Sequence, residues 1–297
     1  MSHPILQRLA RGEILLSDGA MGTELQKRGL KQGECPEALN VNNPEMVLSI
    51  HRDYYQAGAD IVETNSFGGN RARLKMFGLE NQVRIFNRKA AELARSVCPP
   101  NHYVAGSIGP TGELLEPFGT LSLAQAKDYF KEQAEALAEG GVDIFFVETM
   151  STLEEIGAAV EAIKQVSDLP VAASMTYEMS ETGVHTSWGV DVPGAVRFLE
   201  EAGADIIGAN CGNGIDVVLA VIRQMRPLTS LPLLAQPNAG LPQIEGNLIV
   251  YRETPESIKD KYIELLDLQI GILGGCCGTN PAHVQLMRQL IDRRNKK

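Results

Sequence analysis

The amino-acid sequence predicts a single (β/α)8 barrel, or TIM barrel, that spans residues 1–297. Short apolar runs alternate eight times with longer amphipathic segments, which is the pattern of parallel strands separated by helices. No linker or change of composition divides the chain, and its length is normal for one such barrel. An open, doubly wound sheet is the alternative interpretation of the same alternation.

The expected strands are apolar on both faces, as strands buried in a parallel sheet are. In chain order they are Ile14–Ser17, Ile61–Thr64, Tyr103–Ser107, Ile144–Glu148, Val171–Thr176, Ile206–Asn210, Leu233–Gln236 and Ile270–Leu273. The polar, glycine-containing stretch Met179–Gly194 after the fifth strand is expected to be a long loop that could act as a lid.

The helices between these strands have readable ends. Asn43 and Pro44 precede a helix over Met46–Ala57, which Gly58 ends. Thr152 and Glu155 predict a capping box at another helix start. Further start signals are Thr254-Pro255 and Asn280-Pro281, and further stop signals are Gly140-Gly141 and Gly203.

Charge and hydropathy exclude several classes of partner. The formal net charge is −10, and no basic run is longer than the terminal Arg293–Lys297, which argues against nucleic acid and against an anionic membrane surface. No stretch approaches the roughly 18 apolar residues of a membrane span, and the N-terminus lacks the apolar core of a signal peptide. A cytoplasmic protein without a membrane or nucleic-acid partner is therefore expected.

The five cysteines favour metal binding or catalysis over disulfides, because the count is odd and the context is cytoplasmic. Cys211 ends the sixth strand, and Cys276-Cys277 follow the eighth. Because barrel loops converge at the carboxyl ends of the strands, the three thiolates could hold one zinc ion and leave a fourth position open. Small buried residues in a glycine-rich seam, or a phosphate-binding loop, are the alternatives; Cys35 and Cys98 are given no role.

Two carboxylates end other strands. Asp18 follows the first strand and Glu148 ends the fourth, and buried acids are costly unless they are paired, so we expect a cation such as an ammonium group beside them. The turn amides of Gly19–Gly22, together with Thr64, could receive a carboxylate. These residues predict an amino-acid site beside a metal that prefers sulfur. Helix capping or loop hydrogen bonding by the two acids remains open.

The segments at the strand ends resemble motifs of the homocysteine S-methyltransferases, most closely those of the homocysteine-binding module of cobalamin-dependent methionine synthase. The specific part of the resemblance is the cysteine pair within GGCCGT together with an upstream Asn-Cys. The matching segments, which span residues 18 to 279 in the family's order, are Asp18–Thr23, Glu63–Asn70, Ala105–Gly112, Glu148-Thr149, Asn210-Cys211, Pro237–Pro242 and Gly274–Thr279.

The resemblance implies a zinc ion that takes the homocysteine sulfur as its fourth ligand. By motif, the zinc ligands would be Cys211, Cys276 and Cys277, and Asn238 would fill the fourth position when substrate is absent. The groups holding the amino and carboxylate ends of homocysteine would be Asp18, the amides near Ala20 and Met21, Thr64 and Glu148. Coordination by zinc would keep the homocysteine thiol deprotonated. The sulfur would then attack a methyl group in line, and the product methionine would leave the site.

The sequence says less about the methyl donor. We expect methylcobalamin on a separate corrinoid protein, because the chain ends after the eighth unit, or else S-methylmethionine or S-adenosylmethionine. Thr149 stands where betaine-type enzymes carry a tyrosine, which counts against betaine. Tyr177 and Trp188 could contact a cationic donor, although packing is the simpler role, and Tyr177–Gly194 departs from the methionine synthase pattern. Methylation of another small thiol, a non-catalytic zinc- or thiol-binding barrel and a phosphate-handling lyase or isomerase are the competing functions.

Overall fold

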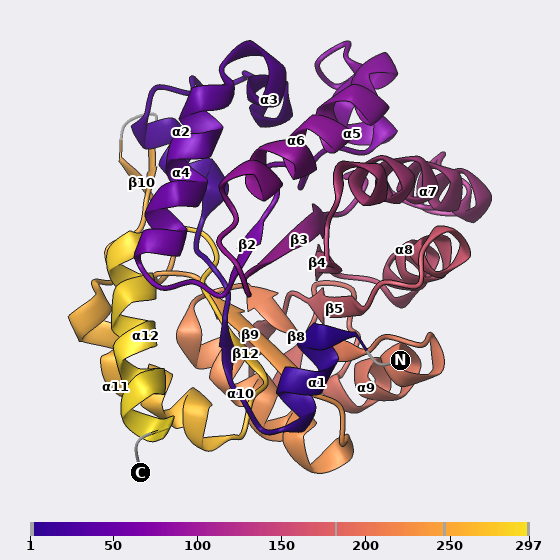
Figure 1. Ribbon diagram of the computed structural model, residues 1–297. Coiled ribbons are helices and arrows are strands. Elements are labelled where there is room, and N and C mark those ends of the chain that lie inside the picture. The colour runs from indigo at the N-terminus through magenta and orange to yellow at the C-terminus, as the bar shows by residue number, and fades with distance from the viewer. Residues whose placement is uncertain (1–2, 182, 246–247, 296–297) are drawn as a thin grey trace.

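The computed structural model describes residues 3–181, 183–245 and 248–295, and it confirms the predicted barrel (Figure 1). Within the described residues, eight parallel strands form one sheet in the order β1-β12-β9-β8-β5-β4-β3-β2, and a parallel bridge from Ser17 to Ile61 joins its two edges. The strands are β1 (Leu15–Leu16), β2 (Ile61–Glu63), β3 (Tyr103–Ile108), β4 (Ile144–Met150), β5 (Val171–Met175), β8 (Ile206–Cys211), β9 (Leu233–Pro237) and β12 (Ile272–Leu273).

The interior of the barrel is filled by apolar side chains from every strand. One buried cluster gathers Leu15, Ile61, Phe146 and their counterparts on the other strands, together with Ile5 and Leu9 of helix α1 (Pro4–Ala10). Helix α1, which crosses in front of the strands in Figure 1, therefore closes the amino-terminal end of the barrel. The opposite, carboxyl-terminal end is left for a functional site.

Helices surround the sheet and bury a second, larger apolar cluster against its outer face. They are α2 (Met21–Lys27), α3 (Leu39–Asn42), α4 (Pro44–Gln56), α5 (Arg71–Lys75), α6 (Val83–Val97), α7 (Leu123–Gly140), α8 (Leu153–Val166), α9 (Val192–Glu201), α10 (Ile215–Met225), α11 (Pro255–Asp267) and α12 (Pro281–Asn295), with short 3-10 helices η1 (Pro36–Ala38), η2 (Glu80–Gln82) and η3 (Arg226–Leu228). The expected signals are confirmed where α4 begins at Pro44, where α11 begins with a capping box from Thr254 and where Gly141, with a φ of 93°, caps the end of α7.

One predicted helix start is only half right. The Thr152 side chain accepts a hydrogen bond from the Glu155 amide at 3.3 Å, as a capping residue should. The Glu155 carboxylate does not return the bond, because it accepts from both the amide and the hydroxyl of Thr111, at 2.8 and 2.6 Å. A buried carboxylate gains more from two donors than from one, so the contact with the β3–α7 loop replaces the capping box.

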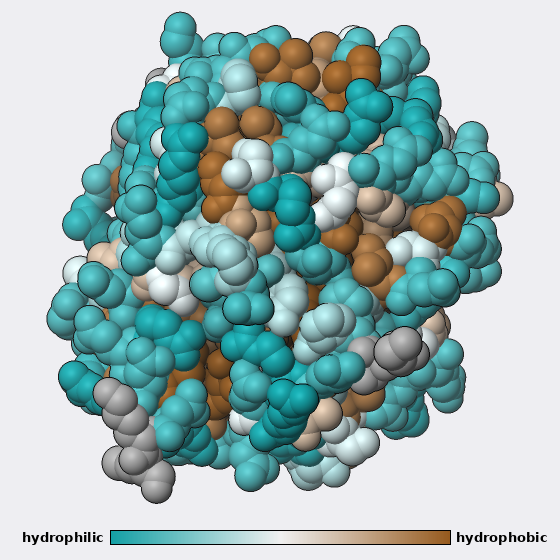
Figure 2. Space-filling model, in the orientation of Figure 1, coloured by the Kyte–Doolittle hydropathy of each residue, from teal (hydrophilic) through white to brown (hydrophobic). Residues whose placement is uncertain are grey.

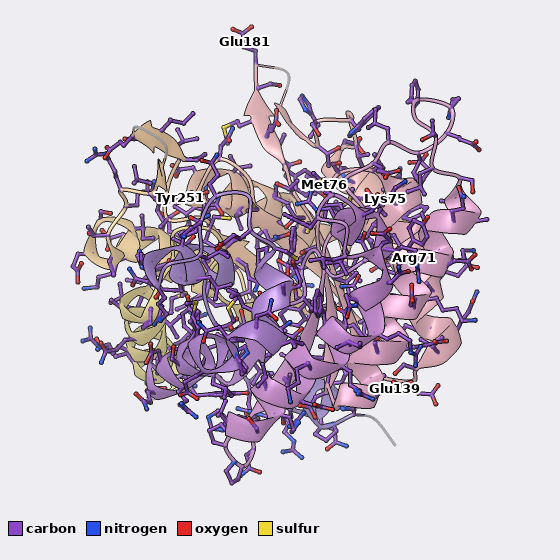
Figure 3. All side chains as sticks on the ribbon, turned by 90° about the horizontal axis from the view of Figure 1, so that it is seen from above. Arg71, Lys75, Met76, Glu139, Glu181 and Tyr251 are labelled. Atoms are coloured by element: carbon purple, nitrogen blue, oxygen red, sulfur yellow. The ribbon has the colours of Figure 1, made fainter. Side chains whose placement is uncertain are left out.

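Two hairpins extend from the carboxyl-terminal end of the barrel. The stretch Met179–Gly194, which was expected to be a loop, contains most of β6 (Glu178–Ser180) and all of its partner β7 (Gly183–His185), and it extends into α9. A second hairpin, β10 (Gln243–Glu245) and β11 (Leu248–Val250), follows β9 and was not expected. In Figure 3 the first hairpin projects from the molecule with Glu181 near its tip, and the second lies to its left.

The face in Figure 2 is mostly hydrophilic, with small and separate hydrophobic areas. Among the helices of the described residues, none is both long and apolar enough to cross a lipid bilayer.

Candidate metal centre and substrate pocket

Cys211 is presented by an abrupt turn at the end of β8. Its φ is 60° and that of the next residue, Gly212, is 68°, so both residues lie in the left-handed region. For a residue with a side chain this conformation costs about 1–2 kcal/mol. At Gly212 a side chain would also meet the Tyr177 carbonyl oxygen at 2.7 Å, so only glycine fits there. Strain of this kind is typical of functional sites.

The adjacent pair Cys276-Cys277 lies in a turn rather than in a strand, as the prediction required. Strand β12 ends at Leu273, and the Cys276 amide then donates to the Pro237 carbonyl at 2.9 Å. The Cys276 carbonyl accepts from the Thr279 hydroxyl at 2.6 Å, which fixes the turn. Two neighbouring side chains can therefore face the same point, which a regular strand would not allow.

The sulfur atoms of Cys211, Cys276 and Cys277, the cysteine cluster, all lie within 4.8 Å of one another. Tetrahedral bonds of about 2.3 Å to one zinc ion would place the sulfur atoms about 3.8 Å apart, so the spacing fits one ion. A hydrogen bond with Cys276 lowers the pKa of Cys211, but contacts with Cys277 and burial raise it to about 12 overall. Asn238 lies beside the cluster, and its hydrogen bond with Cys211 opposes this rise. Its Nδ2 donates to the Gly212 carbonyl at 2.7 Å, whereas its buried Oδ1 has no partner among the described residues. An unpaired oxygen here suits a fourth ligand.

The thiols of the cluster titrate together. Hydrogen bonds from Cys211 and then Cys276 lower the pKa of Cys277 to about 3, and the same contacts, together with burial, raise the pKa of Cys276. The Tyr251 hydroxyl also hydrogen-bonds to Cys277, which stabilises its thiolate. The lowered pKa of Cys277 favours its thiolate, which is the form that binds a soft metal ion.

Three carboxylates, Asp18, Glu63 and Glu148, form an acidic wall next to the cysteines. Asp18 Oδ2 accepts from the Glu63 amide at 3.0 Å, and its buried Oδ1 has no partner in the described chain. Glu148 Oε1 accepts from the Ser107 hydroxyl at 2.6 Å, and Glu63 Oε1 accepts from Gln236. Neither contact supplies a positive charge.

Burial is the largest cause of a raised pKa at all three carboxyl groups of the acidic wall. The pKa of Glu63 is raised further by Glu148 and Asp18, because like charges oppose one another's ionisation. A bound ammonium group would remove this penalty, so the acidic wall has the chemistry of an amine site.

The residues expected to hold a carboxylate, Ala20, Met21 and Thr64, line the same cavity, and their hydrogen-bonding groups differ in availability. The Ala20 amide already donates to the Thr279 hydroxyl at 3.3 Å. Thr64 Oγ1 shares a hydrogen bond of 2.5 Å with Ser66 and accepts from the Ser107 amide. The Met21 amide opens α2 and has no acceptor among the described residues, as expected for a first helical turn.

The structure therefore brings all nine predicted site residues to the carboxyl-terminal end of the barrel, and all but Asp18 and Asn238 line one cavity of about 280 Å³. Both exceptions touch its wall, through the Glu63 amide and Cys211 respectively. The interpretation of Tyr177 and Trp188 as donor contacts gains no support, because neither lines the cavity and Trp188 instead packs against Phe118 at 5.7 Å.

Two residues of the site were not predicted. Glu63 is the last residue of β2, and Glu148 lies near the end of β4, so the rule that singled out carboxylates at strand ends could have found Glu63 as well. Tyr251 comes from the segment after β11, labelled in Figure 3, and packs on Gly278, where a Cβ would meet the Tyr251 side chain at 2.3 Å. No pattern in the sequence places that segment beside the cysteines.

Comparisons with known proteins relate this chain to one enzyme family. The sequence model of the homocysteine S-methyltransferase family matches residues 15–291. Methionine synthases of Mycobacterium tuberculosis and Mycobacterium leprae are each 32% identical, over 92% and 98% of this chain, and the chain spans about a quarter of their length (24% and 25%).

Among solved structures, the metallated homocysteine methyltransferase MmuM of Escherichia coli is 27% identical with a TM-score of 0.80, covering 97% of this chain and 99% of that one. The carboxyl transferase domain of Rhizobium etli pyruvate carboxylase, at 14% identity and a TM-score of 0.54, covers 97% of this chain and 49% of that one and shares the fold alone.

Proposed function

Because the chain belongs to the homocysteine S-methyltransferase family, we propose that it transfers a methyl group to the thiol of L-homocysteine and forms methionine. Residues 1–297 would act as one homocysteine-binding barrel. The observation that carries the proposal is the cysteine cluster, with sulfur atoms within 4.8 Å of one another, at the edge of a cavity walled by buried carboxylates. The likeness to MmuM over nearly the whole of both chains supports it.

The cysteine cluster would hold a zinc ion. When bound, zinc supplies a Lewis acid that keeps the homocysteine thiol deprotonated at neutral pH. Asn238 would occupy the fourth position until homocysteine arrives, which is consistent with its unpartnered Oδ1. Three cysteines and no histidine are the donor set that a thiophilic metal prefers.

The acidic wall would bind the ammonium group of homocysteine. Asp18 and Glu148 would contact it, and Glu63 would hold Asp18 through its amide, at 3.0 Å. The Met21 amide would receive the substrate carboxylate, with Ala20 and Thr64 lining the same end. Anchoring both ends of the amino acid fixes the sulfur, and this orientation lowers the barrier to transfer.

The sulfur then attacks the methyl group, and the electron pair of the broken bond stays with the leaving group. The donor would be S-methylmethionine or S-adenosylmethionine, or methylcobalamin carried by a separate corrinoid protein. No general base is needed, because the nucleophile is already a thiolate.

The test is to incubate the zinc-loaded protein with homocysteine and each donor separately, and to measure methionine. The expected result is methionine from at least one donor, and none when 3-mercaptopropionate, a thiol without an ammonium group, replaces homocysteine. Methylation of that thiol at a similar rate would show a different acceptor. Homocysteine binding without turnover from any donor, the protein-bound corrinoid included, would show a non-catalytic thiol-binding barrel.

A further inference from the structure

Asn210 precedes Cys211 at the end of β8, and its side chain is 1% exposed. In the sheet, β5 lies between β8 and β4, as Figure 1 shows. The side-chain amide of Asn210 crosses that strand. Its Oδ1 accepts from the Ser174 hydroxyl of β5 and from the Thr149 amide of β4, both at 2.8 Å, and its Nδ2 donates to the Thr149 hydroxyl at 2.7 Å. These three hydrogen bonds of normal length fix the orientation of the amide.

The backbone that this amide holds is strained. The φ of Thr149 is 62°, which lies in the left-handed region and is rare for a β-branched residue. The register of β4 against β5 also shifts between Val147 and Met150, so the strand bulges at Glu148 and Thr149. Bulges beside functional sites re-aim side chains, and here Glu148 lines the cavity. The two hydrogen bonds between Asn210 and Thr149 therefore support the turn that presents Glu148.

The same amide also contacts the cysteine cluster. One N–H of Nδ2 is used by Thr149, which leaves the second N–H for other acceptors. Glu148 Oε2 lies 3.5 Å from Nδ2, and Cys276 Sγ lies 3.9 Å from it. Both contacts are long, as expected of one N–H shared between two acceptors. Asn210 thus connects an acid of the acidic wall to a sulfur of the cysteine cluster.

From this arrangement we infer that Asn210 is a positioning residue that fixes Glu148 relative to the cysteine cluster, and thereby sets the length of the amino-acid thiol that fits. The inference rests on the proposed function, because it takes Glu148 as a contact of the ammonium group and Cys276 as a zinc ligand. Homocysteine has two methylene groups between its α-carbon and its sulfur, whereas cysteine has one. A fixed separation between acid and metal therefore favours homocysteine.

The metal end of the site depends on the same residue. A hydrogen bond to a metal ligand orients that ligand and strengthens metal binding. The N–H of Asn210 would act in this way on Cys276, at 3.9 Å from its sulfur. Loss of the amide should therefore weaken zinc binding and homocysteine binding together.

The test measures binding rather than turnover. Isothermal titration in excess zinc gives the Kd of homocysteine and of cysteine, and competition with a chelator gives the Kd of zinc. Asn210→Ala is expected to raise the Kd of zinc about 10- to 100-fold. The Kd of homocysteine should rise about 10-fold, the size of a lost contact with a charged group. The Kd of cysteine should change less than about threefold, because cysteine is too short to reach Glu148 and the metal together.

Asn87→Ala is the matched control. The Asn87 amide of α6 is also fully buried, and its Nδ2 donates to the Gly69 and Val83 carbonyls at 2.8 and 2.7 Å, outside the cavity lining. This variant should lower the melting temperature and leave each Kd within about threefold of wild type. Circular dichroism establishes that each variant folds. Asn210→Ser, which keeps a hydroxyl, takes the place of Asn210→Ala if the alanine variant is unfolded, and the same shifts are expected.

Unchanged affinity of Asn210→Ala for zinc or for homocysteine would overturn the inference. An equal loss of affinity for homocysteine and cysteine would overturn it as well, because a general loosening of the fold predicts that result. Failure of the proposed function has a different signature: wild type itself would bind no zinc, or would bind zinc and show no affinity for homocysteine.

Discussion

Replacing Asp18 with asparagine should weaken homocysteine binding without lowering the stability of the fold. Because the expected effects on binding and on stability have opposite signs, this one variant distinguishes them. Asparagine keeps an oxygen for the Glu63 amide, which Asp18 Oδ2 accepts at 3.0 Å, and removes only the charge. The side chain is 1% exposed and its Oδ1 has no partner in the described chain, so wild type carries an uncompensated buried acid.

The loss of homocysteine affinity follows from the lost charge. A hydrogen bond between a carboxylate and an ammonium group contributes about 1.5–3 kcal/mol, so the Kd for homocysteine should rise about 10- to 150-fold in Asp18→Asn. Stability without homocysteine should not fall, and a gain of about 1 kcal/mol is expected because the buried charge is gone.

The pH dependence of stability and of homocysteine affinity provides a second test of these opposite effects. Burial raises the pKa of Asp18 well above 3.8, so the folded chain binds more protons than the unfolded chain between those two pKa values. The free energy of unfolding therefore falls as pH rises through this window. Homocysteine affinity should rise over the same window, since the ammonium group prefers the ionised acid, and Asp18→Asn should flatten both trends.

Isothermal titration with homocysteine and urea unfolding at several pH values measure these quantities. Asp53→Asn is the control, because Asp53 pairs with Arg28 at the surface and its side chain is 41% exposed. It should change stability by less than about 1 kcal/mol and leave binding unchanged. Wild-type affinity in Asp18→Asn, or a loss of more than about 2 kcal/mol of stability, would refute the reasoning.

Three further predictions address the metal, the acidic wall and the packing of Phe67 against Gly109. Cys276→Ala should sharply lower the amount of zinc bound per chain, measured by mass spectrometry, while circular dichroism still shows a folded barrel. The control variant Cys98→Ala should keep its full zinc content. Global unfolding of Cys276→Ala would mean that the metal is structural. Glu63→Gln should flatten the fall in stability with rising pH, because burial and two neighbouring acids raise its pKa, and unaltered urea-unfolding profiles from pH 4 to 8 would argue against the acidic wall. Gly109→Ala should lower the free energy of unfolding by about 1–3 kcal/mol, since the new Cβ would meet the Phe67 ring at 2.5 Å; a wild-type melting temperature would contradict that packing.

The barrel was predictable because its strands are buried on both faces, which leaves continuous apolar runs such as Ile206–Asn210 in the sequence. The cysteine cluster was predictable for a related reason: in this fold the ends of the strands converge, wherever they lie in the chain.

The parts that were missed depend on contacts between distant segments. The β10–β11 hairpin begins with three exposed residues, Gln243–Glu245, so burial left no alternating pattern to read. The Ala20 amide was expected to be open, but it meets Thr279, 259 positions along the chain. The predicted capping box of Glu155 is also replaced by a contact with a distant residue, because its carboxylate accepts a hydrogen bond from Thr111. Such pairings are decided by tertiary packing rather than by local sequence.

X-ray absorption at the zinc edge, with and without homocysteine, is the sharpest single measurement. We expect three sulfur ligands at about 2.3 Å and one lighter atom in the substrate-free protein, changing to four sulfur ligands when homocysteine is added. A coordination shell with fewer than three sulfur atoms, or one that homocysteine leaves unaltered, would contradict the idea that these cysteines keep a place for the substrate's thiol.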